Sequence, residues 1–418
     1  VLYMIELIKK YLKNSLIPEF NKVPVFSFPS DKRIGLYIHY AFCKHICMFC
    51  PYHKIKYDES IVKEYTDYVI KEFELHNFKS FTSLYIGGGT PSNDKYFLER
   101  ILSFFKDLIK NEISLEIHPL DATSDNIEFY KSNGINFVSL GVQSFDDEFL
   151  QFIGRNHSGS DNEIALENIM NAKFDFVDVD LIFKPEKSFE NLKKDFTSAA
   201  KYSPEQISVY PLMRFSYTGL GKTKNIPSRE KEYFRKLDKE ASDLGYERDT
   251  LWTYTLKSKT GRFSSVGREF YLGLGMSSSS FSGNVFSTNT FSYQKYREYI
   301  LKGKMPVDSV YFFDDYQGAL FYSFWALYNR ELEMKNIEKF FPGGYNKILV
   351  VIKFLKSLKY LKGSGDRYYV TDKGLEMLLE LEEWLTYEFI DPLWSRLRAS
   401  AKKSQLGEIS SPTDNEVY

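Results

Sequence analysis

The chain has 418 residues, which is long enough for one large domain and one or two smaller ones. Its formal net charge of −1 excludes an overall basic field that would attract nucleic acid or an anionic membrane, and its 43% hydrophobic content suffices for packed cores. No apolar run has the length of a membrane span and charge follows the start too soon for a signal peptide, so we expect a cytoplasmic protein.

After an N-terminal arm over residues 1–33, β-forming runs recur at intervals of mostly about thirty residues, which is one strand plus one helix. Amphipathic patterns such as Ile61–Phe78 and Phe97–Ile109 separate these runs. The alternation predicts an α/β fold, an open, partial (β/α)6 barrel with a parallel sheet and outer helices; a closed eight-stranded barrel is the alternative. The predicted strands are Ile34–Tyr40, Ser83–Gly87, Ser114–His118, Phe137–Val142, Phe176–Phe183 and Gln206–Leu212.

All three cysteines lie within eight residues, directly after the first predicted strand, as Cys43, Cys47 and Cys50 in a CxxxCxxC pattern. Thiolates this close can converge on one metal centre. Zinc requires a fourth protein ligand and usually takes two separated ligand pairs. A [4Fe–4S] cluster accepts three thiolates, keeps its fourth iron open for a small molecule, and needs reducing surroundings. The pattern therefore predicts a cluster enzyme, with a zinc knuckle as the alternative.

Further polar and glycine-rich features follow the strands at their C-terminal ends, where sites gather in parallel α/β folds. The turn Gly87–Ser92 contains three glycines, which let the backbone approach a ligand closely, although a simple tight turn before a helix explains it as well. Glu116, Gln143 and Asp180 stand on apolar strands that have little structural need for them. Asp178 is the alternative to Asp180 as the inward-pointing carboxylate.

The first domain is predicted over residues 34–305. It ends with a charged helix over Pro227–Gly245 and with strands at Tyr246–Tyr254 and Tyr271–Met276. The serines of the segment Gly275–Gly283 have two interpretations: hydrogen bonds to a polar ligand, or a turn of small residues.

Residues 306–398 predict a winged-helix-like α+β domain, followed by a polar tail over residues 399–418 that we expect to be disordered. Winged helices also bind DNA, but this one lacks a strong basic face in the sequence. We therefore expect it to cap the open side of the barrel. Its predicted elements are the aromatic helix Asp314–Leu327, the helices Lys335–Phe340 and Tyr345–Leu358, and a hairpin over Leu361–Gly374.

The segment Leu36–Cys50 resembles the radical S-adenosylmethionine (SAM) superfamily, and most closely its branch of oxygen-independent coproporphyrinogen III oxidases. The resemblance extends from Gly35 to Gly374. It implies a [4Fe–4S] cluster, SAM bound at the open iron, and reductive cleavage to a 5′-deoxyadenosyl radical. The radical then abstracts hydrogen from an organic substrate, for which a tetrapyrrole-like molecule is a candidate.

The resemblance also implies the residues that bind SAM, while it leaves the catalytic acid and base unassigned. Gly88, Gly89 and Thr90 match the segment that holds the methionyl ammonium. Arg155 matches an arginine that pairs with the methionyl carboxylate, as a bidentate guanidinium can, although a surface role is the alternative. Tyr37 matches a tyrosine near the sulfonium. The matches to positions that contact methionyl or ribose hydroxyl groups are Glu116, Gln143 and Asp180.

The sequence departs from the resembled branch at several positions, and these departures bear on the predicted reaction and substrate more than on the predicted cluster and SAM. Ala41 replaces a proline, Pro51 follows the third cysteine in place of Gly-Cys, and Ser264–Phe270 lacks the His-Asn pair of heme-handling relatives. Two alternatives therefore accompany the main interpretation: a radical methyltransferase or cyclopropanase that uses two SAM molecules, and a heme-binding chaperone. The implied partners are a small organic substrate and an electron donor such as flavodoxin or ferredoxin. We expect a monomer that binds neither nucleic acid nor membrane.

Overall fold

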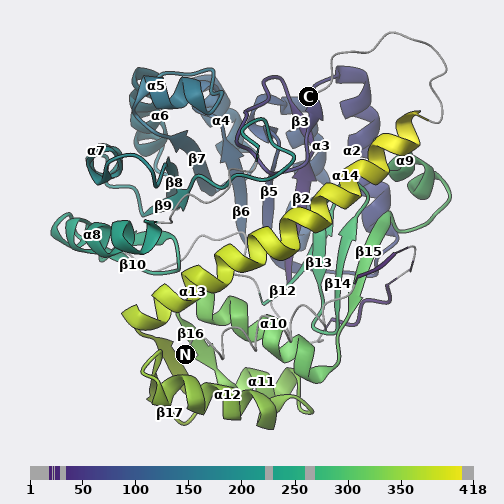
Figure 1. Cartoon of the computed structure of the whole chain (residues 1–418). Helices are drawn as coiled ribbons and strands as arrows, with labels where there is room; N and C mark the ends of the chain where they lie inside the picture. Colours follow the sequence, from purple (N-terminus) through teal and green to yellow (C-terminus); the bar gives the residue numbers. More distant parts are fainter. Residues whose placement is uncertain are drawn as a thin grey trace. The chain divides into compact units, whose positions relative to one another are not determined.

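The chain forms two compact units in the computed structural model, shown in Figure 1. The first, called the barrel unit, comprises residues 36–263 together with 403–418. The second, called the C-terminal unit, comprises residues 1–35 and 264–402. Most of the predicted N-terminal arm lies outside the described residues. So do residues 264–268, which belong to the segment that lacks the His-Asn pair. The structure describes residues 18–20, 22, 24–28, 34–221, 229–258 and 269–406.

The barrel unit contains an open, mostly parallel sheet with the predicted strands in sequential order. Neighbours from β5 to β9 are parallel, β2 lies next to β5, and β9 is followed by the antiparallel strand β11 rather than by a seventh parallel strand. The partial barrel is therefore confirmed and the closed eight-stranded barrel is wrong. The strands are β2 (Ile34–Tyr40), β5 (Phe81–Gly88), β6 (Ile109–Ile117), β7 (Phe137–Gln143), β8 (Phe176–Phe183), β9 (Gln206–Pro211), β11 (Thr253–Leu256) and β10 (Tyr246–Arg248).

Helices connect the strands and cover the sheet with aromatic side chains. Phe73 of α2 packs against Phe105 of α3, with ring centroids 5.0 Å apart, and against Phe81 of β5 at 6.1 Å. Figure 1 shows α5, α6 and α7 beside the parallel strands. The helices are α2 (Glu59–Glu74), α3 (Lys95–Phe105), α4 (Ser124–Ser132), α5 (Asp147–Phe152), α6 (Gly159–Asn171), α7 (Phe189–Ala200) and α8 (Glu230–Asp243).

The C-terminal unit begins with an antiparallel sheet of order β1-β15-β14-β13-β12, most of which the sequence did not predict. The aromatic helix α10 packs on this sheet: Phe321 lies 4.6 Å from Phe281 and 5.4 Å from Phe286, between ring centroids. Residues 270–305 thus belong to the same unit as the C-terminal elements. The sequence had placed them at the end of the first domain, residues 34–305. The elements are β1 (Glu19–Phe20), β12 (Phe270–Leu274), β13 (Ser279–Phe281), β14 (Val285–Asn289), α9 (Tyr293–Leu301), β15 (Val307–Phe312) and α10 (Asp315–Tyr328).

The serine-rich segment is neither a simple turn nor an open set of hydroxyls. Ser280 lies in β13 and its hydroxyl accepts a hydrogen bond from the Gly273 N–H at 2.9 Å. The Ser279 and Thr288 hydroxyls are 3.1 Å apart. These hydroxyls therefore bond to neighbouring strands of their own sheet.

The winged-helix module has the predicted order of elements. The predicted hairpin, β17 and β18, follows the helical pair α11 and α12, and the unpredicted strand β16 precedes that pair and completes a three-stranded sheet of order β16-β18-β17. Its last helix, α13, continues through a π-helical turn into α14, which ends at Leu406 (yellow in Figure 1). An irregular tail can therefore begin only after Leu406, not at residue 399, and residues 407–418 lie outside the described part. The elements are β16 (Glu331–Glu333), α11 (Met334–Phe340), α12 (Tyr345–Ser357), β17 (Leu361–Ser364), β18 (Arg367–Val370), α13 (Asp372–Leu385), the π turn (Thr386–Ile390) and α14 (Asp391–Leu406).

A search of the described helices for a membrane span finds none with the required length and apolar character.

Candidate functional site

The cysteine loop is attached at its base by two short parallel strands, β3 (Phe42–Cys43) and β4 (Ile55–Lys56). The Ile55 N–H donates to the Ala41 carbonyl at 2.8 Å, and the Tyr57 N–H donates to the Cys43 carbonyl at 2.9 Å. This pairing closes the segment that carries the three thiols. All three cysteines are free; Cys43 is buried at 5% exposure, and the other two are half-buried.

The three thiols lie on one loop, but they do not form a ready site for a single metal ion. Among the residues that the structure describes, no three His, Cys, Asp or Glu side chains are arranged to hold one. A [4Fe–4S] cluster binds each thiolate through a different iron, so three thiols of one loop are a suitable donor set for it. That the three sulfurs converge on one such centre stays a prediction.

Two of the thiols receive hydrogen bonds from residues distant in the sequence. The Thr90 hydroxyl donates to the Cys43 sulfur at 3.4 Å, and the Arg155 Nη1 donates to the Cys47 sulfur at 3.5 Å. Burial raises the pKa of the Cys43 thiol to about 12, although the Thr90 hydrogen bond lowers it. Metal binding has to displace this proton, because thiols bind metals as thiolates.

The middle of the cysteine loop rests on two segments that the sequence analysis did not single out. The Met48 N–H donates to the Ile153 carbonyl at 3.1 Å, and the Leu220 N–H donates to the Met48 carbonyl at 3.3 Å. A Cβ added to Gly154 would lie 3.0 Å from Met48 Cγ, and one added to Gly219 would lie 3.2 Å from Met48 Cβ. The small residues near Met48 thus let the loop sit close to the end of α5.

The glycine-rich turn packs tightly against β2 and β3. The Gly89 N–H donates to the Tyr40 carbonyl at 2.6 Å, and a Cβ on Gly89 would lie 2.4 Å from the Phe42 carbonyl oxygen. Gly88 has a φ of +114°, and its Cβ would lie 2.5 Å from the His39 ring. This packing alone accounts for both glycines, so their role toward SAM depends on the resemblance.

Glu116 is held on two sides by neighbours on β5. One carboxylate oxygen accepts from the Tyr85 hydroxyl at 2.8 Å, and the other accepts from the Gly88 N–H at 3.0 Å. Burial raises the pKa of Glu116, and these two hydrogen bonds oppose that rise. Tyr85 was missed by the sequence analysis; its position two residues before Gly87 on the same strand is the signal that could have identified it.

Tyr37 points toward a histidine that the sequence analysis also missed. The His39 Nε2 lies 2.9 Å from the His53 carbonyl, which can only accept, so His39 Nδ1 accepts from the Tyr37 hydroxyl at 2.8 Å. The Tyr37 and Tyr85 ring centroids are 5.9 Å apart. Burial raises the pKa of Tyr37 well above its ordinary value, so the phenol stays protonated.

Asp178 and Asp180 lie on the same face of β8, because residues two apart in a strand share a face. Treating one as the alternative to the other was therefore wrong. The Ser208 hydroxyl donates to Asp178 at 2.8 Å, and the Ser139 hydroxyl donates to Asp180 at 2.5 Å. Burial and then the charge of Asp178 raise the pKa of Asp180 well above its ordinary value.

Arg155 is a half-buried residue of the loop between α5 and α6 rather than a surface residue. Its Nη2 donates to the Gly141 carbonyl at 2.9 Å, in addition to the Nη1 bond to Cys47. Its Nε is buried and has no hydrogen-bond partner among the described residues. Gln143, the last residue of β7, has a φ of +67°, a left-handed conformation that is uncommon for glutamine. A register shift between β7 and β8 also falls here.

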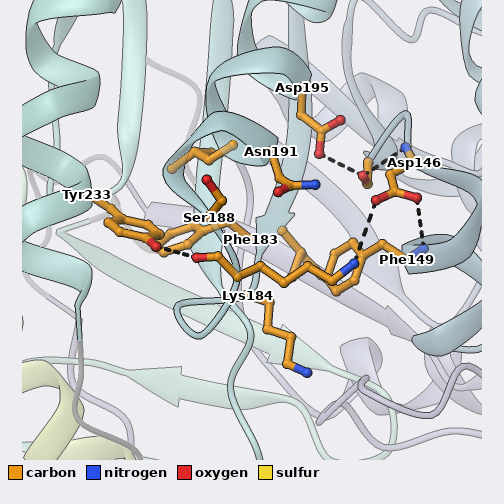
Figure 2. Close-up of a pocket in the computed structure, with 12 residues that line it drawn as sticks. Asp146, Phe149, Phe183, Lys184, Ser188, Asn191, Asp195 and Tyr233 are labelled. Atoms are coloured by element: carbon orange, nitrogen blue, oxygen red, sulfur yellow. Dashed lines mark hydrogen bonds and ion pairs between the residues drawn. The ribbon is translucent and has the colours of Figure 1, made fainter.

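A separate small cavity lies between the β7–α5 turn, the start of α7 and α8 (Figure 2). Asp195 accepts there from the Ser144 hydroxyl at 2.6 Å, and the Tyr233 hydroxyl donates to the Lys187 carbonyl. The cavity volume is ≈ 20 Å³, which is room for about one water molecule. It is too small for a cofactor and includes none of the predicted site residues.

The predicted residues thus form connected groups in the barrel unit. Thr90 and Arg155 contact cluster-loop thiols, while Gly88 contacts Glu116. Glu116 and Arg155 both act electrostatically on Asp180, the first raising and the second lowering its pKa. The donors therefore suit an anionic cluster and a ligand with both charged and hydroxyl groups.

Comparisons with known proteins agree with this arrangement. A family described as the Radical SAM superfamily matches residues 37–195. The protein named heme chaperone HemW of Lactococcus lactis is 29% identical over 45% of this chain and 51% of its own length. A protein of the same name from Buchnera aphidicola (Schizaphis graminum) is 28% identical over 83% of this chain and 97% of its own length. The chain thus aligns with about half of the first relative and nearly all of the other.

The fold has a counterpart among solved structures. Coproporphyrinogen III oxidase (HemN) from Escherichia coli superposes with a TM-score of 0.70 at 19% identity, over 84% of this chain and 90% of the other. That likeness shows a common fold, and the motif residues lie within the matched segment. A radical SAM domain implies a [4Fe–4S] cluster and SAM. Residues 37–195 carry such a domain, and the chain is similar to the coproporphyrinogen III oxidase-like (HemN-like) branch of that superfamily.

Proposed function

We propose that the chain is a radical SAM enzyme that holds a [4Fe–4S] cluster through Cys43, Cys47 and Cys50. The observation that carries this proposal is the position of Arg155. Its guanidinium bonds to the Cys47 sulfur and to the Gly141 carbonyl, and its Nε is left buried without a partner among the described residues. An unused N–H next to a cluster thiol is suited to an anionic group of a ligand.

When bound, the cluster would supply the electron that cleaves SAM to methionine and a 5′-deoxyadenosyl radical, which abstracts hydrogen from an organic substrate. Arg155 would pair with the methionyl carboxylate. Gly88, Gly89 and Thr90 would face the methionyl ammonium, and Tyr37 would line the sulfonium side.

The hydroxyl groups of SAM would be bound by the polar strand ends, namely Glu116, Gln143 and Asp180. The hydrogen bonds from Tyr85 and Ser139 orient two of these carboxylates before a ligand arrives. Each carboxylate oxygen has two lone pairs, so these bonds leave capacity for a ligand hydroxyl. Because the pKa of Asp180 is raised, this carboxyl group can also carry a proton and donate a hydrogen bond to the ligand.

We propose that one SAM suffices. The serine-rich segment was the sequence feature that favoured a second SAM, and therefore a methyltransferase or cyclopropanase. Several of its hydroxyls bond within the β12–β14 sheet, so that feature no longer supports a second molecule. A flavodoxin or ferredoxin in a reducing cytoplasm would supply the electron to the monomeric enzyme.

Heme transfer is the second candidate, because relatives named heme chaperone HemW include one that aligns over 97% of its length. The sequence weakens this candidate: the last histidine is His157, so the remaining residues supply no imidazole to heme iron.

One anaerobic experiment separates the two candidates. The reconstituted protein should contain about four irons per chain and, after dithionite reduction, release methionine and 5′-deoxyadenosine from SAM in equal amounts. A protein that binds one heme per chain and never cleaves SAM would support the chaperone and contradict the enzyme. Zinc binding without an iron cluster would contradict both.

A further inference from the structure

A lysine-rich surface covers one side of the winged-helix module in the C-terminal unit. Between Glu338 and Asp366 the chain contains six lysines and no Asp or Glu. The surface, called the lysine face, consists of Lys347, Lys353 and Lys356 on α12, Lys359 just after it, and Lys362 on β17. The net charge of −1 hides this face, since acidic residues elsewhere balance it. The expectation that the module lacks a strong basic face was therefore wrong.

The charge of the lysine face is available to an external partner. All five lysines are exposed. Within the described part of the chain, Lys353, Lys356, Lys359 and Lys362 form no ion pair. Neighbouring cations differ: Arg367 pairs with Glu331 and Glu333 at 3.3 and 2.6 Å. The fold thus neutralises the charge at the tip of the hairpin and leaves the α12 side positive.

The position of α12 is that of the second helix in a helix-turn-helix. It follows α11 after the short turn Phe341–Gly344 and precedes the β17–β18 hairpin. Its inward side packs into the module through Ile348, Ile352 and Leu355, all buried. Its outward side therefore carries the lysines, and between them Val350 and Phe354, which are 68% and 39% exposed.

Two kinds of polyanion could bind such a face, and the geometry favours one. A helix that lies on a membrane buries its apolar side in the lipid, but the apolar side of α12 is already packed against its own module. The lysines also spread from the helix across the next turn into a hairpin strand. In helix-turn-helix proteins the second helix enters the major groove, while basic residues around it contact phosphates.

We propose that the lysine face binds the phosphate backbone of duplex nucleic acid, with α12 as the helix that enters the major groove. Lys353, Lys356, Lys359 and Lys362 would contact phosphates. Val350 and Phe354 would make apolar contact with base edges, as apolar side chains do with thymine methyl groups. This activity is independent of the cluster site and of the proposed radical chemistry.

The test uses the full chain and a fluorescently labelled DNA duplex about two helical turns long. Binding is measured by anisotropy between about 50 and 200 mM salt. The triple variant Lys353→Gln, Lys356→Gln, Lys359→Gln should weaken binding by about tenfold or more. It should also make the slope of log K against log[salt] shallower by about 2.7, because three phosphate contacts are lost. The control variant Lys63→Gln, Lys193→Gln, Lys236→Gln makes the same charge change at lysines that pair with glutamates. It should bind like the unmodified protein.

Three outcomes would overturn the proposal: no duplex binding at low salt, equal weakening by both triple variants, or binding to anionic phosphatidylglycerol vesicles with none to the duplex. The vesicle result would assign the face to membranes instead. Circular dichroism of each variant verifies folding, which exposed Lys→Gln changes should not affect. Since SAM cleavage is not the readout, failure here leaves the proposed enzyme function unaffected.

Discussion

At the scale of single residues, the candidate site depends on polar groups that the chain brings together over long sequence distances. Arg155 and Cys47 are 108 positions apart, yet they are within hydrogen-bond distance. The half-buried guanidinium already bonds to Gly141, so its orientation is fixed before any ligand binds. With this preorganisation, one arginine would be able to serve both a cluster thiol and a bound carboxylate, as proposed.

Replacing Arg155 tests its proposed role in binding SAM. Losing a charge-assisted hydrogen bond costs about 1.5–3 kcal/mol, so Arg155→Ala should weaken SAM binding roughly ten- to a hundredfold. Iron content should remain normal, because the arginine is not a cluster ligand. Arg155→Lys keeps the charge but loses the planar fork, and should give an intermediate affinity. Isothermal titration calorimetry measures the dissociation constant of SAM for the unmodified protein and both variants. An unchanged dissociation constant for Arg155→Ala would mean that Arg155 does not bind SAM.

Replacing one cysteine tests the cluster ligands. Cys47→Ala should leave two thiolates, which cannot hold the [4Fe–4S] cluster, so iron content after reconstitution should fall from about four per chain to near zero. SAM cleavage should disappear with it. Iron assay and electron paramagnetic resonance of the reduced protein measure both effects. Full iron content with normal turnover in Cys47→Ala would mean that the ligands lie elsewhere.

The neighbouring His118 and His157 predict a loss of stability in acid. Their rings lie 5.1 Å apart, and burial, together with the charge of Arg155, lowers the pKa of His157 to about 4 and that of His118 to about 2. The unfolded chain binds protons to these groups below about pH 6.5, whereas the folded chain does not. The free energy of unfolding should therefore fall as the pH drops from about 6.5 to 4, by roughly 1.4 kcal/mol per pH unit for each histidine.

Urea unfolding of the metal-free, reduced protein across this pH range measures that slope. His157→Gln removes one titrating group, so its slope should be smaller by roughly 1.4 kcal/mol per pH unit. An identical slope in the variant would mean that His157 is protonated in the folded protein.

At the scale of elements, the end of β5 is shaped by its contact with β2 and β3. The turn approaches so closely that the Gly89 position faces two backbone carbonyls, of Tyr40 and Phe42. Backbone atoms cannot rotate away as the end of a side chain can. The glycine sequence that resembles a cofactor-binding motif is thus also required by local packing, and the two requirements coincide at one turn.

Gly89→Ala should therefore destabilise the protein strongly. The added methyl group would lie 2.4 Å from the Phe42 oxygen, and overpacking against atoms that cannot move costs up to about 3 kcal/mol. Gly221→Ala is the matched control, because its added methyl meets nothing within 4 Å and only its φ of +61° opposes the change. The control should cost about 1 kcal/mol. The midpoints of urea unfolding measure the loss of stability in both variants. Equal losses would show that the structure shifts to relieve the contact between the added methyl group and the Phe42 oxygen.

At the scale of the whole molecule, each of the two units contains an apolar cluster of its own. Phe149, Ile153 and Ile182 belong to one apolar cluster in the barrel unit, while Phe291 and Leu397 belong to another in the C-terminal unit. The proposed cluster site lies entirely in the first unit, and the lysine face lies entirely in the second. Substitutions in one core should therefore leave the chemistry of the other unit intact.

Gly318→Leu tests this separation. A Cβ at Gly318 would lie 2.5 Å from the Gly283 carbonyl oxygen and 2.7 Å from the Phe341 ring, so leucine should destabilise the C-terminal unit by about 1–3 kcal/mol. Iron content and SAM affinity should stay unchanged. Calorimetry should show that one transition moves to lower temperature while another does not. A single transition that shifts as a whole would mean that the units unfold together.

The sequence by itself determined the features that short-range patterns encode. Short apolar, β-rich runs placed β2 and β8 with their actual bounds, and the number and spacing of the cysteines predicted the cluster loop before any coordinates. Only the tertiary structure decided that Arg155 reaches Cys47, that Asp178 and Asp180 share a face, and that the serines form β13. It also decided that the lysines gather on one surface of a nearly neutral chain. Periodicity records whether a residue is buried, whereas strand register and helix packing determine which distant residues meet.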